Sequence, residues 1–571
     1  MAPSLLRLFV RWRRLPFLAA TDLLLMAGMV GMVFGLVSLG GEWTHAMRPA
    51  VDIDLSLGAL PRYAFYSLSR GLIAYCFSLA FTLVYGYWAA KDAVAEKILV
   101  PLLDVLQSVP VLGFMPGLVL ALVAAFPRSN LGLELACVLM IFTGQAWNMT
   151  FSYYQSLKSV PPDLREAADA YRFDWRRRLL GVELPYASMG LVWNSMMSMA
   201  GGWFFLTITE SFVLGNRDFR LPGIGSYMSA AVGKGDKAAM AGAVIAMSAM
   251  IVLLDQLLWR PVVAWAQKFR VDDAGARDPA KSWFLDLLKR SGIVAFGRAL
   301  LKSLLPRLPA GEIMAAPAGA ASWGPQAARV LLALLVALMA MGVVKLVVLL
   351  ARVPGRGWCD LGVAAAWTLS RVILSTALGT LWAVPAGLAI GLSPRLSRTF
   401  QPIVQVVASF PAPMLFPAAV AVFAALGLGL GWGSVALMLL GTQWYILFNA
   451  VAGAMAIPAD LLEAARAYGL SPWQRLTRVY LPATFSFLVT GWVTAAGGAW
   501  NASIVAEYVT DHGRVLTANG LGARISVAAD KGDLPALAAG VVVMSALVVL
   551  FNRVVWRRLY GLAETRFSLN R

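Results

Sequence analysis

The sequence is poor in the residues from which most metal, redox and catalytic centres are built. Its 571 residues include two histidines, His45 and His512, and three cysteines, Cys76, Cys137 and Cys359. No two cysteines form a CxxC pair, so the pattern predicts neither a disulfide framework nor a zinc site. Two isolated histidines also argue against a metal centre or proton relay built on imidazole. We expect no metal site and no catalytic residue in this chain.

Charge is scarce as well. Charged residues make up 14% of the chain and hydrophobic residues 59%, whereas soluble domains carry roughly 25% charged residues. Apolar stretches such as 21–40 and 534–551 recur, and each is long enough to cross a hydrocarbon core of about 30 Å. The net charge of +18 comes from basic residues in the short loops between such stretches. That distribution is typical of a membrane protein that follows the positive-inside rule, and it does not indicate nucleic-acid binding.

The chain contains two copies of one unit. An offset of 297 residues aligns polar, proline and glycine positions that unrelated apolar helices would not share. These pairs include Glu166/Glu463, Trp203/Trp500, Glu210/Glu507, Gly223-x-Gly225/Gly520-x-Gly522 and Lys234-Gly235-Asp236/Lys531-Gly532-Asp533. Nearer the start of each half the offset is 301, as in Ser108-x-Pro110 and Ser409-x-Pro411. The first copy therefore has four extra residues, and the turn at 126–130 is their expected place.

Each half is expected to form six membrane-spanning helices, which makes the fold an all-α integral membrane protein of about 12 spans. In the first half, 1–260, the spans are expected near 20–40, 68–90, 99–126, 131–151, 187–212 and 237–259. In the second half, 327–571, they are expected near 328–351, 365–392, 402–426, 433–453, 484–508 and 534–556. An even number of spans in each half makes the copies parallel rather than inverted repeats.

Basic residues predict which loops face the cytoplasm. With the N-terminus inside, the loops after the second and fourth span of each half, the linker and the C-terminus are cytoplasmic, and all of them carry lysine or arginine. The linker, 261–326, divides in two. The stretch 282–305 is amphipathic and basic and is expected on the inner membrane surface, whereas 306–325 is rich in Pro, Ala and Gly and is expected to be flexible.

The loops after the fourth spans, 162–185 and 458–482, share one pattern. Each predicts two short helices separated by a turn, with Asp163 or Asp460 capping the first helix and a glutamate three residues further on, as in a capping box. A Leu-Pro pair is expected to close the second helix, because proline cannot continue it.

One position distinguishes the two loops. Gly469 follows the first short helix of the second loop, where a left-handed residue commonly ends a helix, but the first loop has Arg172 there. A non-glycine residue in that conformation costs about 1 kcal/mol or more. We therefore expect the first loop to turn differently, with Asp174 capping a new helix start.

Both loops resemble the EAA motif in the permease subunits of binding-protein-dependent ABC importers. The second loop matches in full, with Glu463, Gly469 and Pro482, and the first departs at Arg172. The resemblance implies two tandem type I permease units in a bacterial inner membrane, with both termini in the cytoplasm. It also implies that each loop docks on an ATPase subunit. The residues implied in this coupling are Glu166, Ala167, Ala168, Arg172, Leu184, Pro185, Glu463, Ala464, Ala465, Gly469, Leu481 and Pro482.

The resemblance implies partners as well. The chain has no GxxxxGK[ST] sequence with which to hold ATP. We therefore expect no enzymatic activity and no cofactor in this chain, with ATP and Mg bound instead by two separate cytoplasmic ATPase subunits. An extracytoplasmic solute-binding protein and the surrounding lipid are the other expected partners, and no nucleic acid is expected.

Polar groups and helix breaks within the spans are candidates for the substrate path. Glu210 and Glu507 either line the path or pair with nearby arginines, Arg217 or Arg220 in the first half and Arg514 in the second. The two tryptophans of the fifth spans either anchor at the membrane interface or gate the path, and the Ser-x-Pro breaks either line a cavity or only kink the third spans. The candidates are Ser108, Pro110, Trp203, Glu210, Ser409, Pro411, Trp500, Asn501 and Glu507.

The solute is indicated only by resemblance. The segments 424–433 and 497–509 are similar to the permeases of nitrate, sulfonate, taurine and bicarbonate importers, which implies a small anion. No ring of arginines within the spans supports an anion path, so an amino-acid or metal importer stays open. The halves differ in charge where Asp104 and Asp255 correspond to Gln405 and Asn552, so a pore built from both would be asymmetric.

Two other classes of protein compete with the importer. A secondary transporter driven by an ion gradient is the main alternative, but it would need acidic relays within the membrane and would not need two EAA loops. An intramembrane enzyme would need a cluster of nucleophilic or metal-binding residues.

Overall fold

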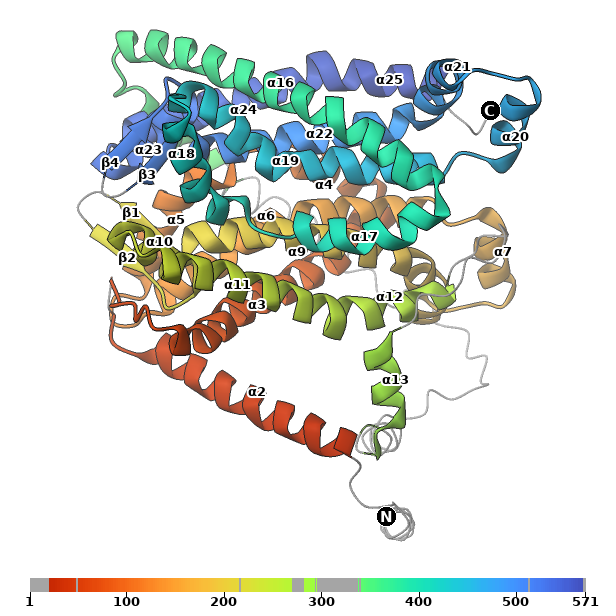
Figure 1. The fold of residues 1–571 in the computed structure, drawn as a ribbon, viewed down its shortest axis with the longest axis horizontal. Helices are drawn as coiled ribbons and strands as arrows, with labels where there is room; N and C mark the ends of the chain where they lie inside the picture. Colours follow the sequence, from red (N-terminus) through yellow and green to blue (C-terminus); the bar gives the residue numbers. More distant parts are fainter. Residues whose placement is uncertain are drawn as a thin grey trace. The chain divides into compact units, whose positions relative to one another are not determined.

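The computed structural model describes residues 20–47, 50–214, 217–269, 282–292, 294, 337, 340–511 and 514–567, and most of them are helical (Figure 1). The chain divides into two compact units. Unit 1 comprises Met1–His45, Ser152–Met196 and Val252–Ala333, and unit 2 comprises Ala46–Phe151, Met197–Ile251 and Leu334–Arg571. Unit 2 therefore contains helices from both sequence halves.

The helices follow the order expected from the repeat. In the first half they are α2 (Ala20–Thr44), α3 (Leu60–Lys91), α4 (Ala93–Ser108), α5 (Val111–Ala125), α6 (Leu131–Lys158), α7 (Pro162–Ala170), α8 (Trp175–Arg178), α9 (Leu184–Thr209), α10 (Ile224–Lys234), α11 (Lys237–Leu254) and α12 (Arg260–Ala266). In the second half they are Ala340–Leu350, α16 (Gly355–Leu392), α17 (Pro394–Ala408), α18 (Phe416–Ala425), α19 (Leu430–Met455), α20 (Ala459–Ala467), α21 (Pro472–Arg475), α22 (Leu481–Ala506), α23 (Leu521–Lys531), α24 (Leu534–Phe551) and α25 (Arg557–Arg566).

Eight of the described helices are long and apolar enough to cross a membrane, and a bent pair, Pro394–Ala408 with Ala412–Ala425, makes a ninth if it counts as one span. These confirm an all-α membrane protein. The other three expected spans fall on helices that are broken, less apolar or shorter. They are 99–126 on α4 and α5, 187–212 on α9, and 328–351, of whose helix the stretch Ala340–Leu350 is described.

Both third spans break where the repeated Ser-x-Pro sequence predicts. In the first half α4 ends at Ser108 and Pro110 is the N-cap of α5. In the second half the chain bends by 82° between α17 and the short 3-10 turn Ala412–Leu415 that leads into α18. Proline explains both breaks, since it cannot donate a helical hydrogen bond and it disfavours helical geometry in the residue before it.

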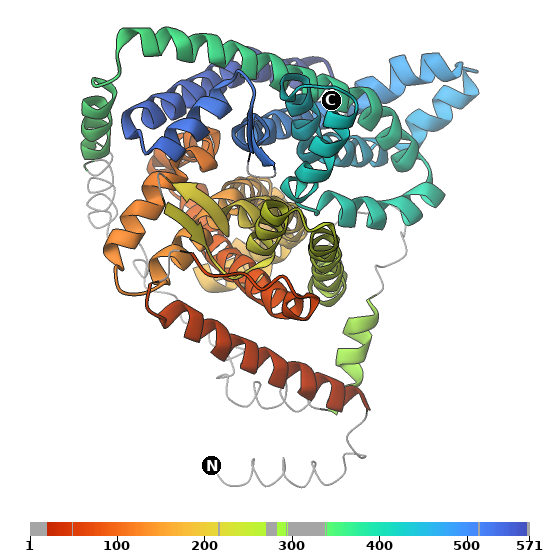
Figure 2. The same ribbon diagram turned by 60° about the vertical axis from the view of Figure 1, so that its left-hand side comes forward.

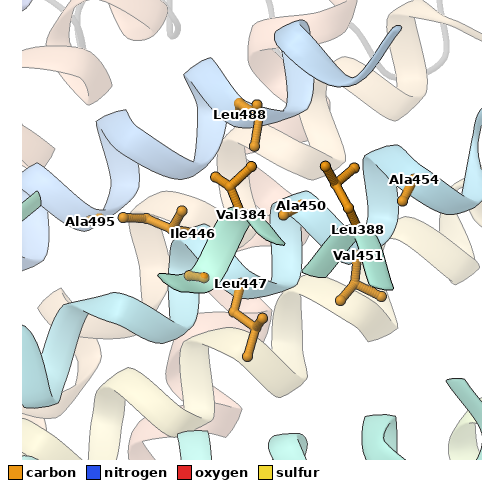
Figure 3. Close-up of a cluster of buried hydrophobic side chains, with 10 residues drawn as sticks. Val384, Leu388, Ile446, Leu447, Ala450, Val451, Ala454, Leu488 and Ala495 are labelled. Carbon is orange, nitrogen blue, oxygen red and sulfur yellow. The ribbon is translucent and has the colours of Figure 1, made fainter. Parts of the chain in front are cut away.

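The core of unit 2 includes a cluster of small and branched side chains where α16, α19 and α22 meet (Figure 3). Glycine lets two of these helices come close together. A Cβ at Gly387 of α16 would lie 2.5 Å from the Cβ of Ala450, and one at Gly391 would lie 2.5 Å from that of Ala454. Close packing through small residues is what holds helices together in lipid, where the hydrophobic effect between them is absent.

Two short hairpins were not expected from the sequence. The fifth spans end at Thr209 and Ala506, and each is followed by two antiparallel strands, β1 (Ser211–Leu214) with β2 (Arg217–Arg220), and β3 (Tyr508–Asp511) with β4 (Arg514–Thr517). In each hairpin the pair of residues farthest from the turn is Ser211 with Arg220 in the first half and Tyr508 with Thr517 in the second. In the first half the hairpin packs beside α10, as Figure 2 shows.

The linker contributes one described helix, α13 (Trp283–Arg290), whose first turn is capped by the hydroxyl of Ser282. Its end is fixed to the start of α2 within unit 1, because the Ser291 hydroxyl donates to the Asp22 carboxylate at 2.6 Å. The expected amphipathic stretch beyond 294 and the whole of 306–325 lie outside the described residues.

Candidate functional site

A cavity of about 280 Å³ lies within unit 2, and both sequence halves line it. Its walls come from α4, α5, α6 and α9 of the first half and from α17, α19, α22 and α24 of the second. Several lining residues occupy equivalent places at the offset of 297, namely Gly144/Gly441, Trp147/Trp444 and Gly201/Gly498. Equivalent positions of the duplicated halves therefore meet around one shared cavity.

The cavity wall is polar but uncharged. Among the described residues that line it, none is an aspartate, glutamate, lysine, arginine or histidine. The polar lining residues are Gln107, Thr143, Asn148, Ser198, Thr442, Tyr445, Thr494, Asn501 and Asn552, and tryptophan and phenylalanine supply much of the rest. Such a wall can orient a small solute through hydroxyl and amide groups without the cost of a buried charge.

One residue of this wall joins the two halves directly. The Asn501 side chain on α22 accepts a hydrogen bond from the backbone N–H of Val111 at 2.8 Å. Val111 is the first residue of α5, so its N–H has no partner within its own helix. Asn501 therefore caps α5 from another helix, a role that Pro110 cannot fill with its own side chain.

The other path candidates are distributed unevenly. Pro411 lines the cavity together with Phe410 and Ala412, so the break in the second half borders the open space. Ser409 instead bonds back to the carbonyl of Gln405 at 2.8 Å, and the side chain of Ser108 lies outside the described part of the structure. Trp203 and Trp500 are buried, at 1% and 2% exposure, away from the cavity wall.

Glu210 belongs to a buried ion-pair cluster in unit 2. The Arg70 guanidinium on α3 donates to Glu210 Oε1 at 2.8 Å, and it makes two bonds with Glu134 of α6, at 2.6 and 2.7 Å. Ser67 also donates to Glu210, at 2.7 Å, and the N–H of Gly225 donates at 2.7 Å. All three charged side chains are at most 1% exposed.

The second half repeats this cluster with two changes. Arg371 on α16 donates to Glu507 at 2.8 Å, Thr368 takes the place of Ser67, and the N–H of Gly522 donates to Glu507 at 2.9 Å. The position of Glu134 is taken by Gly431, whose backbone carbonyl accepts from Arg371 Nε at 3.2 Å.

The expectation that Glu210 pairs with Arg217 or Arg220, and Glu507 with Arg514, is wrong. Burial explains why, because a carboxylate closed off from water needs a partner that reaches it inside the protein. The arginines that do so were missed, although a signal existed: Arg70 and Arg371 recur at the offset of 301 within the second spans, and an arginine in an apolar span implies a partner.

The repeated Gly-x-Gly sequence makes room for these carboxylates. A Cβ at Gly223 would lie 2.3 Å from the carboxyl group of Glu210, and one at Gly520 would lie 2.1 Å from that of Glu507. A Cβ at Gly225 or Gly522 would collide with a backbone oxygen of the fifth span, at 2.6 and 2.3 Å. The two glycines therefore allow the loop to close over the buried glutamate.

The two EAA loops have matching conformations. Glu166 and Glu463 are exposed, whereas the second alanine of each triplet, Ala168 or Ala465, is buried. Each loop also exposes a tyrosine at the equivalent position, Tyr171 at 77% and Tyr468 at 84%. In unit 2, α20 and α21 project beyond the ends of α19 and α22 (Figures 1 and 2).

Arg172 has the same left-handed conformation as Gly469, with φ of 49° and 63°, so the expectation that the first loop turns differently is wrong. The helix end imposes the turn. The N–H of Phe173 bonds to the carbonyl of Ala168 at 2.9 Å, as that of Leu470 does to Ala465 at 3.2 Å. These six-residue closures satisfy the last helical carbonyls only if the residue before them is left-handed. Asp174 caps α8 as expected, accepting from the N–H of Arg177.

Two smaller expectations about these loops are also wrong. Asp163 and Asp460 do not cap α7 and α20, since these helices begin at Pro162 and Ala459 and the aspartates lie inside their first turns. A capping box does occur, but in the second short helix, between Ser471 and Gln474.

The Leu-Pro pairs do not close a helix either. The chain passes through a π-helical turn, Leu179–Glu183 or Leu476–Tyr480, and continues into α9 or α22. The wide turn lets proline occupy the start of the next α-helical segment, where its missing N–H is tolerated. The second short helix of each loop is thus continuous with the fifth span.

Comparison with known proteins bears on both halves. The family model of the binding-protein-dependent transport system inner membrane component matches residues 82–258 and again 379–567, more than half of the chain. A nitrate import permease, NrtB of Leptolyngbya laminosa, is 30% identical over 148 residues, 25% of this chain and 52% of its own length. The taurine permease TauC of Escherichia coli is 26% identical over 34% of this chain and 67% of its own.

A bicarbonate permease, CmpB of Synechocystis, is 27% identical over 25% of this chain and 49% of its own length, so the chain spans about half to two thirds of these relatives. Among solved structures, a chain of the MetNI methionine ABC transporter in an inward-facing conformation has 21% identity and a TM-score of 0.31, over 36% of this chain and 99% of its own.

Proposed function

Because the chain belongs to the family of binding-protein-dependent transport system inner membrane components and carries the family domain twice, we propose that it forms the whole transmembrane channel of an ABC importer. The observation that carries the proposal is a cavity in unit 2 that equivalent positions of both halves line. In this proposal the two copies of the family domain in one chain take the place of two separate permease subunits and enclose the path together.

The two EAA loops are proposed to receive the ATPase subunits. Each exposes its glutamate and a tyrosine, and exposed aromatic side chains are common at protein–protein interfaces. Each loop is also continuous with a fifth span that lines the cavity, α9 or α22. A movement of the loop by an ATPase would therefore be passed to the cavity wall through a helix.

The proposed cargo is a small anionic solute, taken from an extracytoplasmic binding protein. Relatives named for nitrate, taurine and bicarbonate support this class. The cavity supports it through its size, near the lower end of the roughly 300–1,000 Å³ typical of small-molecule pockets, and through hydroxyl and amide groups that can donate hydrogen bonds to an anion. The proposed location is a bacterial inner membrane with both termini in the cytoplasm.

Reconstitution tests the proposal. The chain alone in proteoliposomes should not hydrolyse ATP, and the chain with its co-expressed ATPase and binding protein should accumulate nitrate, taurine or bicarbonate only when ATP is supplied. Native mass spectrometry should find two ATPase subunits on one chain. Accumulation driven by an ion gradient without ATP would instead establish a secondary transporter.

A further inference from the structure

The cavity wall contains a hydroxyl group that no described residue satisfies. Ser198 on α9 is 4% exposed, and its Oγ has no hydrogen-bond partner in the described part of the chain. Hydroxyls in helices usually bond back to their own carbonyls. Thr207 and Thr209 on the same helix do so, at 3.0 and 2.9 Å. Ser195 on the same helix also has a buried hydroxyl without a partner among the described residues, but of the two only Ser198 lines the cavity. Burying such a group costs free energy unless something that enters the cavity bonds to it.

A second hydroxyl in the wall of the same cavity, that of Tyr445 on α19, also makes no hydrogen bond with the described residues. The Tyr445 ring lies near two equivalent glycines of the fifth spans: a Cβ at Gly498 would be 3.3 Å from its Cε2, and one at Gly201 would be 3.7 Å from its Oη. Ser198 precedes Gly201 by three residues on α9, so the two share one helix face about one turn apart. Both Ser198 and Tyr445 line the cavity.

These two groups occur only once in the duplicated chain. At the offset of 297, Ser198 corresponds to Ala495, and Tyr445 corresponds to Asn148. The pair thus combines one residue from each half and breaks the symmetry of the cavity. An unpaired hydroxyl in the cavity wall is free to bond with a solute that enters the cavity.

We propose that Ser198 and Tyr445 form a hydrogen-bonding subsite for the anionic group of the transported solute, an oxygen of a nitrate, sulfonate or carboxylate. The subsite rests on the proposed function. Both hydroxyls donate to the oxyanion, which makes charge-assisted bonds stronger than those between neutral groups. No fixed positive charge stands in the described wall, so the anion is held without an ion pair that would oppose its release.

Direct binding tests the subsite. The purified full chain in nanodiscs is titrated with sodium nitrate and with taurine against sodium chloride at equal ionic strength, and the thermal unfolding midpoint is followed, because a ligand of the folded state raises it. At least one of the two probes should stabilise the wild type. Ser198→Ala and Tyr445→Phe, which remove only the hydroxyls, should each weaken that binding about tenfold.

Ser248→Ala is the matched control, because the Ser248 hydroxyl bonds to the carbonyl of Val244 on its own helix and does not line the cavity. It should bind the probes like the wild type. The subsite is refuted if Ser198→Ala binds as tightly as the control, or if neither probe stabilises the wild type. Should Tyr445→Phe fail to fold, Ser198→Ala decides alone, since alanine already stands at its counterpart, Ala495.

ATP-driven accumulation in proteoliposomes separates this failure from that of the proposed function. Unaltered probe binding by Ser198→Ala, combined with ATP-driven uptake by the wild type, refutes the subsite and leaves the importer standing. The absence of uptake by the wild type with its ATPase and binding protein refutes the importer itself.

Discussion

Glu134 and Gly431 occupy equivalent positions in the two halves, and each supplies the oxygen that accepts a hydrogen bond from the arginine Nε of its own cluster. In the first half that oxygen belongs to a carboxylate, at 2.6 Å from Arg70; in the second it belongs to the backbone, at 3.2 Å from Arg371. The first cluster therefore buries two acids with one arginine, and the second buries one acid with one arginine. A neutral acceptor is sufficient at this place, whereas the glutamate that directly follows the fifth span is present in both halves.

The two acids around Arg70 should accordingly differ in importance. We expect Glu134→Gln to lower stability by less than about 2 kcal/mol, since a neutral acceptor serves the second half. Glu210→Gln should cost about 3–5 kcal/mol, because it breaks a buried pair and sets an amide N–H₂ against the N–H and hydroxyl donors of Gly225 and Ser67. Thermal unfolding of the detergent-solubilised variants measures both, and equal losses would contradict the argument.

The lack of space between the buried glutamates and the glycines beside them predicts that two glycine substitutions lower stability. Gly223→Ala and Gly520→Ala place a Cβ within 2.3 Å of a carboxyl group, so each should lower the unfolding midpoint clearly. Gly233→Ala is the control, since a Cβ at this position on α10 meets nothing within 4 Å. There the change should be neutral or stabilising by about 0.5–1 kcal/mol through better helix propensity.

The left-handed turn in the EAA loops predicts opposite effects at equivalent positions. Arg172→Gly should stabilise the loop by up to about 1 kcal/mol, because glycine relieves the strain at φ of 49°. Gly469→Val should destabilise by about 1–2 kcal/mol or more, since a β-branched residue is poorly tolerated there. The unfolding midpoint and the capture of ATPase subunits are the measurements.

Arg172→Ala serves as the control for this pair, because it keeps the strain and removes the guanidinium. We expect it to leave ATPase capture nearly unchanged. A loss as large as that of Gly469→Val would show that Arg172 is a docking contact in its own right.

Asn501 allows its capping role to be separated from its place in the cavity wall. Asn501→Ala removes the acceptor for the Val111 N–H and should cost about 1 kcal/mol of stability. Asn501→Asp keeps the acceptor but puts a negative charge into an uncharged wall, so stability should be retained while uptake of an anion falls. Thermal unfolding and anion uptake are measured on both variants. An Asn501→Asp variant that transports anions at the wild-type rate would contradict the expected effect of the added charge.

The sequence alone determined the duplication, the all-α membrane fold and the positions of the two EAA loops. These are local or repeated signals: apolar runs of membrane length, and polar residues that recur at fixed offsets. The sequence also placed the breaks of the third spans, because proline acts on its immediate neighbours.

Only the tertiary structure decided which groups meet. Arg70 and Glu210 are 140 residues apart, and Val111 and Asn501 are 390 apart, and no local pattern predicts pairs at such separations. The sequence offered arginines a few residues away as ion-pair partners for Glu210 and Glu507. Because the two carboxylates are buried, they pair instead with arginines that reach them inside the protein. Arg172 shows the same limit at short range. Its own preference disfavours the left-handed turn, yet the hydrogen bonds that finish the helix require it, and their combined free energy exceeds the strain of one residue.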